Sequence, residues 1–155
     1  LAKIPDWWKR LPFDTILTPH PGEMSILTGL SIEEIQSDRW EVSRQYADKW
    51  GCVVVLKGAL TVIASPDGRL AILPIATPAL ARAGTGDVLA GLICGLRAQG
   101  VRAFEAAIAG AWIHGQAGLS ACKIHGQPIS VLAGDVLSAI PGVLKTMTES
   151  KKAGA

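Results

Sequence analysis

Charged residues are scarce in this chain, and they form no strong cluster of one sign. Asp, Glu, Lys and Arg make up 18% of the 155 residues, and 15 basic against 13 acidic side chains leave a net charge of +2. The basic residues are scattered, which excludes the broad positive surface of a nucleic-acid-binding protein. We therefore expect neither nucleic acid nor a membrane as a partner.

Cysteine is also scarce, and long uncharged apolar runs are missing. The three cysteines, Cys52, Cys94 and Cys122, are odd in number, lack the spacing of metal ligands, and each lie in an apolar run. We expect buried free thiols in a reducing compartment. No apolar run reaches about 18 residues without a charge, and no signal-peptide pattern appears. A cytoplasmic protein is expected.

Apolar residues, by contrast, are abundant. They make up 49% of the sequence, and the mean hydropathy of +0.33 is high for a chain without a membrane span. We expect strands buried on both faces, an interface between copies of the chain in a homo-oligomer, or a covering segment outside this sequence. The length is that of one ordinary domain.

The pattern along the chain predicts an α/β fold with helices packed on a sheet. Residues 52–58 (CVVVLKG) form a continuous, mostly β-branched run, typical of a strand covered on both faces. The other strands are expected at 14–18, 61–65 and 69–74, the last two joined by a hairpin turn at 66–68. The helical patterns cover residues 22–29, 31–51, 85–99, 102–123 and 133–149.

Local signals refine these helices. Ser31 and Glu34 have the spacing of a capping box, and Gly51 is placed to end the same helix. Pro141 should kink or split the last helix. Trp40 lies on the approximate apolar stripe of residues 31–51 and is expected in the core.

Residues 83–91 (AGTGDVLAG) place an acid at the start of an apolar helical pattern. Gly84 and Gly86 allow a sharp turn and a close approach of the backbone to a ligand. The helix N-terminus offers free N–H groups and a partial positive charge, which together bind anions. Two roles are open for Asp87. It can cap the helix and compensate its dipole, or it can take a proton from a hydroxyl beside bound phosphates.

Two further segments follow predicted strands. LTPHPGE (17–23) holds His20 between two prolines just past a strand end, where ligands bind in open α/β sheets. A surface turn is the alternative. LKGALT (56–61) places Lys57 at the end of an apolar strand, where it either extends to solvent or reaches a phosphate. His114, in a helical pattern of small residues, is interpreted as a packing residue.

The stretches TPHPGE (18–23), VVLKGALTVI (54–63) and GTGDVLAG (84–91) resemble, in their order and spacing, the ADP/ATP-dependent NAD(P)H-hydrate dehydratases of the ribokinase-like superfamily. GTGD is shared across ribokinase-like kinases, whereas TPHPGE together with VLKG is far more specific. The resemblance implies a mostly parallel sheet flanked by helices. The family domain is nearly twice as long, so residues 1–155 are expected to form the C-terminal part of a single domain.

The resemblance also implies an activity and a site. The family dehydrates hydrated NADH or NADPH to the normal cofactor with hydrolysis of ADP or ATP. A Mg²⁺ ion would offset the phosphate charge, although the sequence shows no metal-ligand cluster. His20 and Asp87 would contact the hydrated substrate, with Asp87 as the catalytic carboxylate. The residues implied to bind the nucleotide are Lys57, Gly58, Ala59, Leu60, Thr61, Gly84, Thr85 and Gly86.

One loop departs from the family pattern. Residues 77–84 read TPALARAG where the family commonly has NPGMATGG, and Arg82 could add a phosphate contact or face solvent. An NAD(P)H-hydrate epimerase, fused or separate, is an expected partner. Two alternatives stay open: a small-molecule kinase of the same superfamily, which would share Asp87 and the helix anion site, and a non-catalytic nucleotide-binding module.

Overall fold

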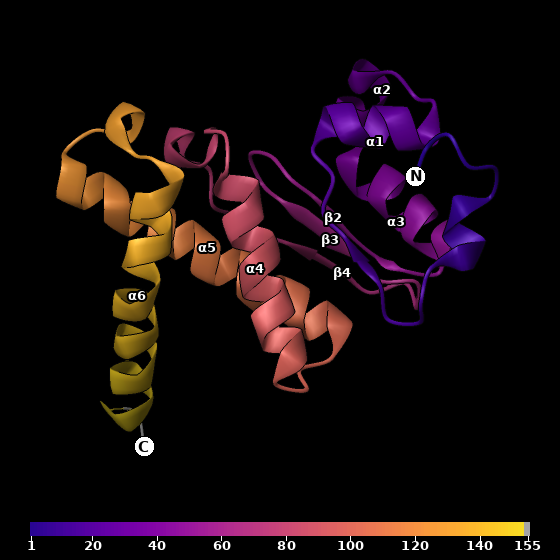
Figure 1. Ribbon diagram of the computed structural model, residues 1–155. Coiled ribbons are helices and arrows are strands. Elements are labelled where there is room, and N and C mark those ends of the chain that lie inside the picture. The colour runs from indigo at the N-terminus through magenta and orange to yellow at the C-terminus, as the bar shows by residue number, and fades with distance from the viewer. Residues whose placement is uncertain (154–155) are drawn as a thin grey trace.

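The computed structural model describes residues 1–153, with side chains through residue 149. Figure 1 shows a small sheet with α1, α2 and α3 on one side and α4 and α5 on the other, while α6 packs beyond α5. The helices are α1 (Pro21–Thr28), α2 (Ile32–Ser37), α3 (Arg39–Trp50), α4 (Thr85–Ala98), α5 (Ala103–His125) and α6 (Ala133–Ala153). The short 3₁₀ turns are η1 (Trp7–Arg10), η2 (Pro78–Leu80) and η3 (Pro128–Ser130).

The sheet has the order β1 (Ile16–Leu17), β2 (Val53–Leu56), β3 (Val62–Ala64) and β4 (Leu70–Ile72). Only β1 and β2 pair in parallel, and the other two pairs are antiparallel. The prediction of a mostly parallel sheet is therefore wrong for the described strands. The connections at 57–61 and 65–69 are too short for parallel strands, which need a crossover of a dozen or more residues.

β2 is buried on both faces, as its sequence predicted. Val54 and Leu56 belong to the core under α1–α3, whereas Val53 and Val55 belong to the core under α4 and α5. Side chains alternate between the two faces of a strand, so one run of four apolar residues contributes to both cores. Burial of each such side chain stabilises the fold by roughly 1.5–3 kcal/mol.

A third core lies between α5 and α6, where Ile113 and Ala117 pack with Val136 and Ile140. Of the kink or split expected at Pro141, the split is absent, because α6 continues through this residue. Proline removes one backbone hydrogen bond from a helix interior. The apolar contacts with α5 hold the helical turns on the N-terminal side of Pro141 in place.

The capping box at Ser31 and Glu34 is confirmed, but the helix predicted for 31–51 is two helices. The backbone breaks at Asp38 (φ −144°, ψ 69°), whose side chain then caps α3. The break shifts the helical phase, so the prediction of a buried Trp40 is wrong. Its side chain is 57% exposed, and Tyr46 and Trp50 lie on the buried face instead.

The cysteine prediction holds only in part. Cys52 is buried and Cys122 is partly buried, but Cys94 is exposed on α4. Cys94 follows Ile93, which faces the core, and so lies outside the buried stripe of that helix. Within residues 1–153, none of the helices combines the length and apolar character needed to cross a membrane.

Candidate active site

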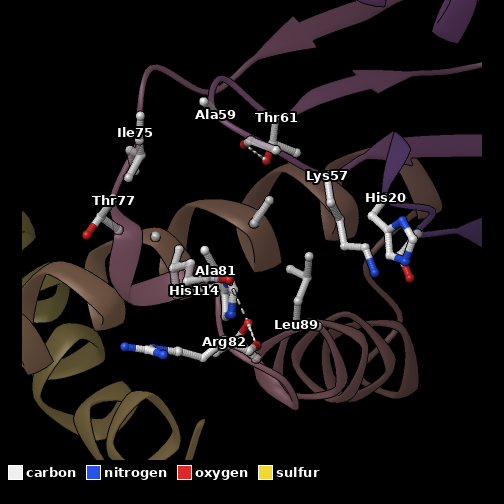
Figure 2. A pocket seen from close by; sticks show the side chains of 18 of the residues that line it. His20, Lys57, Ala59, Thr61, Ile75, Thr77, Ala81, Arg82, Leu89 and His114 are labelled. Atoms are coloured by element: carbon white, nitrogen blue, oxygen red, sulfur yellow. Dashed lines mark hydrogen bonds between the residues drawn. The ribbon is translucent and has the colours of Figure 1, made fainter. Parts of the chain in front are cut away.

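A cavity of about 780 Å³ lies where the ends of β1 and β2 meet the start of α4. Its lining joins the three segments that the sequence singled out, and Figure 2 shows several of these side chains around it. Such a volume is typical of a small-molecule site. The predicted site residues that line the cavity are His20, Lys57, Gly58, Ala59, Thr61, Gly84, Thr85, Gly86 and Asp87. Leu60 is the predicted residue outside the lining.

His20 is held by the first turn of α1. Its Nδ1 accepts a hydrogen bond from the Glu23 N–H at 3.1 Å, and its own N–H donates to Glu23 Oε2 at 2.7 Å. This reciprocal arrangement is a capping box in which histidine replaces the usual Ser or Thr. The His20 ring is therefore oriented by residues three positions away in the sequence.

Lys57 connects the first two segments. Its backbone N–H donates to Pro19 O at 2.8 Å, which extends the parallel pairing of β1 and β2. Its Nζ lies 3.4 Å from Glu23 Oε2, and Figure 2 shows the Lys57 side chain directed toward His20. A Cβ atom on Gly86 would lie 3.2 Å from the same Nζ. The ammonium group thus lies between α1 and the start of α4.

His20 and Lys57 both shift the pKa of the Glu23 carboxylate. Partial burial alone would raise its pKa. The hydrogen bond from the His20 backbone and the charge of Lys57 outweigh this effect, so the pKa of Glu23 lies below its ordinary value. An ionised Glu23 therefore faces the Lys57 ammonium in the cavity at neutral pH.

The turn from β2 to β3 needs unusual backbone angles. Gly58 has φ +148° and Leu60 has φ +58°, a left-handed conformation that costs a non-glycine residue energy. The Thr61 hydroxyl closes the turn by donating to Gly58 O at 3.2 Å. Half of the Leu60 side chain is exposed, so Leu60 shapes the turn without lining the cavity.

The third segment forms the start of α4. Gly84 is the N-cap, with φ +86° and no side-chain capping bond. The buried Thr85 hydroxyl lies 2.8 Å from two backbone acceptors, Leu80 O and Arg82 O, and so holds the preceding loop. Asp87 lies in the first turn, exposed at the cavity, and its carboxylate forms no capping hydrogen bond within residues 1–149. The structure thus does not show the capping expected of Asp87, whereas its first-turn position allows it to compensate the helix dipole.

Two further residues enter the lining. His114 on α5 is only 7% exposed, and its Nε2 is buried without a hydrogen-bond partner among the described residues. Burial lowers its pKa, which favours a neutral ring. Arg82 donates to Ile129 O at 2.6 Å and also lines the cavity. The sequence indicates only a packing residue at His114, because nothing local shows that α5 passes under the cavity.

Comparison with solved structures identifies the class of protein. The chain matches the crystal structure of ADP/ATP-dependent NAD(P)H-hydrate dehydratase from Bacillus subtilis, co-crystallised with ATP/Mg²⁺, with a TM-score of 0.81 and 35% identity. The match covers 86% of this chain and 48% of that chain. The mixed sheet and its helices are therefore a segment of an α/β ribokinase-like fold.

Sequence comparison specifies the family. The family model for NAD(P)H-hydrate dehydratase matches residues 6–142, and the chain belongs to this family. It is 48% identical over 134 residues to the bifunctional NAD(P)H-hydrate repair enzyme Nnr of Moorella thermoacetica, covering 86% of this chain and 25% of that protein. It is 42% identical to the ADP-dependent (S)-NAD(P)H-hydrate dehydratase of Neisseria meningitidis, covering 87% of this chain and 46% of that protein. The chain thus spans half or less of the length of these relatives.

Proposed function

We propose that the full-length protein dehydrates hydrated NADH or NADPH back to the normal cofactor, using ADP or ATP. One observation carries the proposal: a single cavity receives His20, Lys57, Asp87 and the N-terminus of α4. Membership of the NAD(P)H-hydrate dehydratase family supports the same substrate. Residues 1–155 would contribute the nucleotide part of this site and a portion of the substrate part.

The geometry supports a division of roles around the α4 N-terminus. Its free N–H groups and positive dipole end, together with the Lys57 ammonium, would hold the nucleotide phosphates. The exposed Asp87 carboxylate would take the proton of the hydrated ring's hydroxyl as that oxygen attacks the terminal phosphoryl group, whose bond to the bridging oxygen breaks and releases AMP from ADP or ADP from ATP. The resulting phosphate ester would then lose inorganic phosphate and a ring proton, which restores the double bond. Phosphate is a much better leaving group than hydroxide.

A Mg²⁺ ion fits this site only as an ion carried chiefly by the phosphates. In the part of the chain that the structure describes, no three His, Cys, Asp or Glu residues are grouped to hold a metal. Glu23 and Asp87 are the two carboxylates of the lining, and Glu23 is already paired with Lys57. The ion would offset phosphate charge, with one of these carboxylates as a direct or water-bridged ligand.

The stereochemistry of the substrate suggests a partner activity. Hydration creates a carbon with two possible configurations, and the Neisseria meningitidis relative is named for the S form. A protein that accepts one configuration leaves the other unrepaired. We therefore propose an NAD(P)H-hydrate epimerase as a fused or separate partner, in keeping with relatives named as bifunctional repair enzymes.

Turnover of hydrated NADH tests the proposal. The full-length protein is incubated with hydrated NADH, Mg²⁺ and either ADP or ATP, and the return of NADH absorbance and the release of phosphate are followed. Lys57→Met should weaken nucleotide binding in titration calorimetry, because the ammonium beside the α4 N-terminus is lost. Lys145→Met is the control, since Lys145 is exposed and its ion-pair contact is with Glu149.

The products separate the alternatives. Recovery of NADH together with inorganic phosphate supports the dehydratase. A stable phosphorylated alcohol would instead indicate a small-molecule kinase. Nucleotide binding without either product would indicate a non-catalytic module. Equal nucleotide affinity for Lys57→Met and Lys145→Met would remove Lys57 from the nucleotide site.

A further inference from the structure

Arg39, the first residue of α3, lies outside the cavity lining and donates hydrogen bonds to the end of β2. Its Nη2 donates to Leu56 O at 2.9 Å and to Lys57 O at 3.2 Å. Its Nη1 donates to Gln36 Oε1 at 2.8 Å. One partly buried guanidinium therefore holds the two carbonyl groups at the point where β2 turns into the loop 57–61.

The charge of Arg39 lies in an environment that does not favour it. No carboxylate within residues 1–149 forms an ion pair with it, and its Nε is buried without a hydrogen-bond partner there. It also starts a helix, where the dipole favours negative charge. Burial lowers its pKa, although an arginine stays protonated. By contrast Arg44, on the same helix, is exposed and paired with Glu41.

The guanidinium also lies against the loop backbone. A Cβ atom on Gly58 would lie 3.0 Å from Nη2 and 3.1 Å from Nη1 of Arg39. Gly58 has φ +148°, which also excludes most side chains. Glycine at this position therefore serves two needs, the backbone angle and the close approach of Arg39.

These contacts determine which way the peptide groups face. The peptide between Leu56 and Lys57 is held at both ends, by Arg39 on its carbonyl and by Pro19 O on its N–H. In the next peptide Arg39 holds the Lys57 carbonyl, and in a planar trans peptide the N–H points the opposite way. The Gly58 N–H therefore faces away from Arg39. It has no backbone or side-chain acceptor among the described residues, and Gly58 lines the cavity.

We propose that Arg39 is a positioning residue for the nucleotide loop 57–61. By fixing the Leu56 and Lys57 carbonyls, it leaves the Gly58 N–H free to donate to a ligand oxygen and orients the Lys57 side chain. Its unpaired positive charge behind the loop favours an anionic ligand in front of it. The identification of that ligand as an adenine nucleotide rests on the proposed function, whereas the orientation of the loop does not.

The test compares Arg39→Met, Arg39→Lys and the matched control Arg44→Met in the full-length protein. Amide hydrogen exchange reports the loop through the Lys57 N–H, which donates to Pro19 O, and titration calorimetry reports the Kd of ADP. For Arg39→Met we expect faster exchange confined to this loop and an ADP Kd roughly tenfold to a hundredfold higher, since hydrogen bonds to a charged group are lost. The kcat measured at saturating nucleotide should change less than the KM for the nucleotide. Arg39→Lys should recover only part of the affinity, because an ammonium lacks the planar fork.

Several outcomes would overturn the proposal. One is an ADP Kd for Arg39→Met within twofold of the parent, with loop exchange equal to that of Arg44→Met. If Arg39→Met does not fold, Arg39→Lys decides: parent-like affinity overturns the proposal, and weaker affinity with a parent-like melting curve supports it. A parent that binds no adenine nucleotide contradicts the proposed function instead. Loop exchange in the same variants then still decides whether Arg39 positions residues 57–61.

Discussion

At the scale of single residues, the cavity side chains are oriented mainly by short-range contacts. His20 is held by Glu23, three residues away, and the Thr85 hydroxyl contacts Leu80 O and Arg82 O within five residues. Lys57 differs, because its ammonium meets Glu23 from a separate strand. Local sequence therefore explains most of the orientation of these side chains, and the meeting of Lys57 with Glu23 requires the fold.

Asp87 is predicted to be catalytic. Asp87→Asn keeps the size of the side chain and removes the base, so turnover of hydrated NADH should fall roughly 10²–10⁴-fold. The lost interaction with the helix dipole is worth only about 0.3–1 kcal/mol of stability. Turnover and urea unfolding of the variant in the full-length protein check both numbers. Near-normal turnover would exclude the catalytic role. Asp48→Asn, which changes an exposed carboxylate of α3, is the control.

Glu23 should make the free energy of unfolding depend on pH in the acid range. Its pKa in the folded state lies below the ordinary value of 4.5, so the ionised form stabilises the fold above the unfolded-state pKa. This contribution is lost as the pH falls through the lowered pKa. Urea midpoints measured between about pH 6 and pH 3 should therefore decline less steeply for Glu23→Gln than for the parent.

Glu33→Gln is the matched control for this experiment. Glu33 lies in the first turn of α2 and forms no ion pair or side-chain hydrogen bond within residues 1–149. Glu23 also lies in the first turn of its helix, so Glu33→Gln controls for the loss of a helix-dipole interaction. Identical slopes for Glu23→Gln and Glu33→Gln would contradict the coupling of Glu23 to His20 and Lys57.

At the scale of elements, α5 is built for close contact. Small residues along it let neighbouring segments approach its backbone: Gly110 faces Ile93 of α4, Gly115 faces Ile75, and Gly118 faces Leu80. The last two contacts place the loop before α4 directly on α5. The start of α4, and with it the candidate site, therefore depends on this helix for its position.

Gly110→Ala and Gly95→Ala should have opposite effects on stability. A Cβ on Gly110 would lie 2.7 Å from Ile93 Cγ1, and overpacking of this kind costs typically about 1–3 kcal/mol. Gly95 on α4 has nothing within 4 Å of the same position, so alanine there should add about 0.5–1 kcal/mol through helix propensity. Urea unfolding of both variants measures the difference. Two stabilising substitutions would show that α4 and α5 do not pack this closely.

At the scale of the whole molecule, three apolar cores are arranged in sequence from α1–α3 through the sheet to α4 and α5, and on to α6. Apolar side chains nevertheless remain exposed, including Leu137, Leu144 and Met147 on α6. Association into a homo-oligomer, and the position of residues 1–155 as the C-terminal part of one domain, stay predictions.

The cysteines should report on the unfolding of the whole molecule. Burial raises the pKa of Cys52 to about 12, and its thiol lies in the core under α1–α3. Because the thiolate is the reactive form, a thiol reagent near pH 8 should modify exposed Cys94 rapidly and Cys52 only on unfolding. Mass spectrometry of the labelled peptides checks the order. Rapid labelling of Cys52 in native protein would contradict its buried position. Cys94→Ser, which removes the exposed thiol, is the control.

Sequence by itself determined most of the elements, the family and the three segments that supply much of the candidate cavity. Those signals are local: the capping box at Ser31, the two-faced strand 52–58, the glycines around Thr85 and the strand-end Lys57. Backbone propensity and side-chain alternation act over a few residues, so they can be recognised without knowing the fold. The catalytic and binding roles assigned to the cavity residues stay predictions.

Tertiary structure alone decided the partners of these elements. The parallel pairing of β1 with β2, the passage of α5 beneath the cavity with His114, and the contact of Arg39 with the Leu56 and Lys57 carbonyls join residues up to dozens of positions apart. Such contacts depend on how helices and strands pack against one another. At the break at Asp38, the side chain of Asp38 caps α3, Trp40 lies outward, and Tyr46 and Trp50 pack in the core.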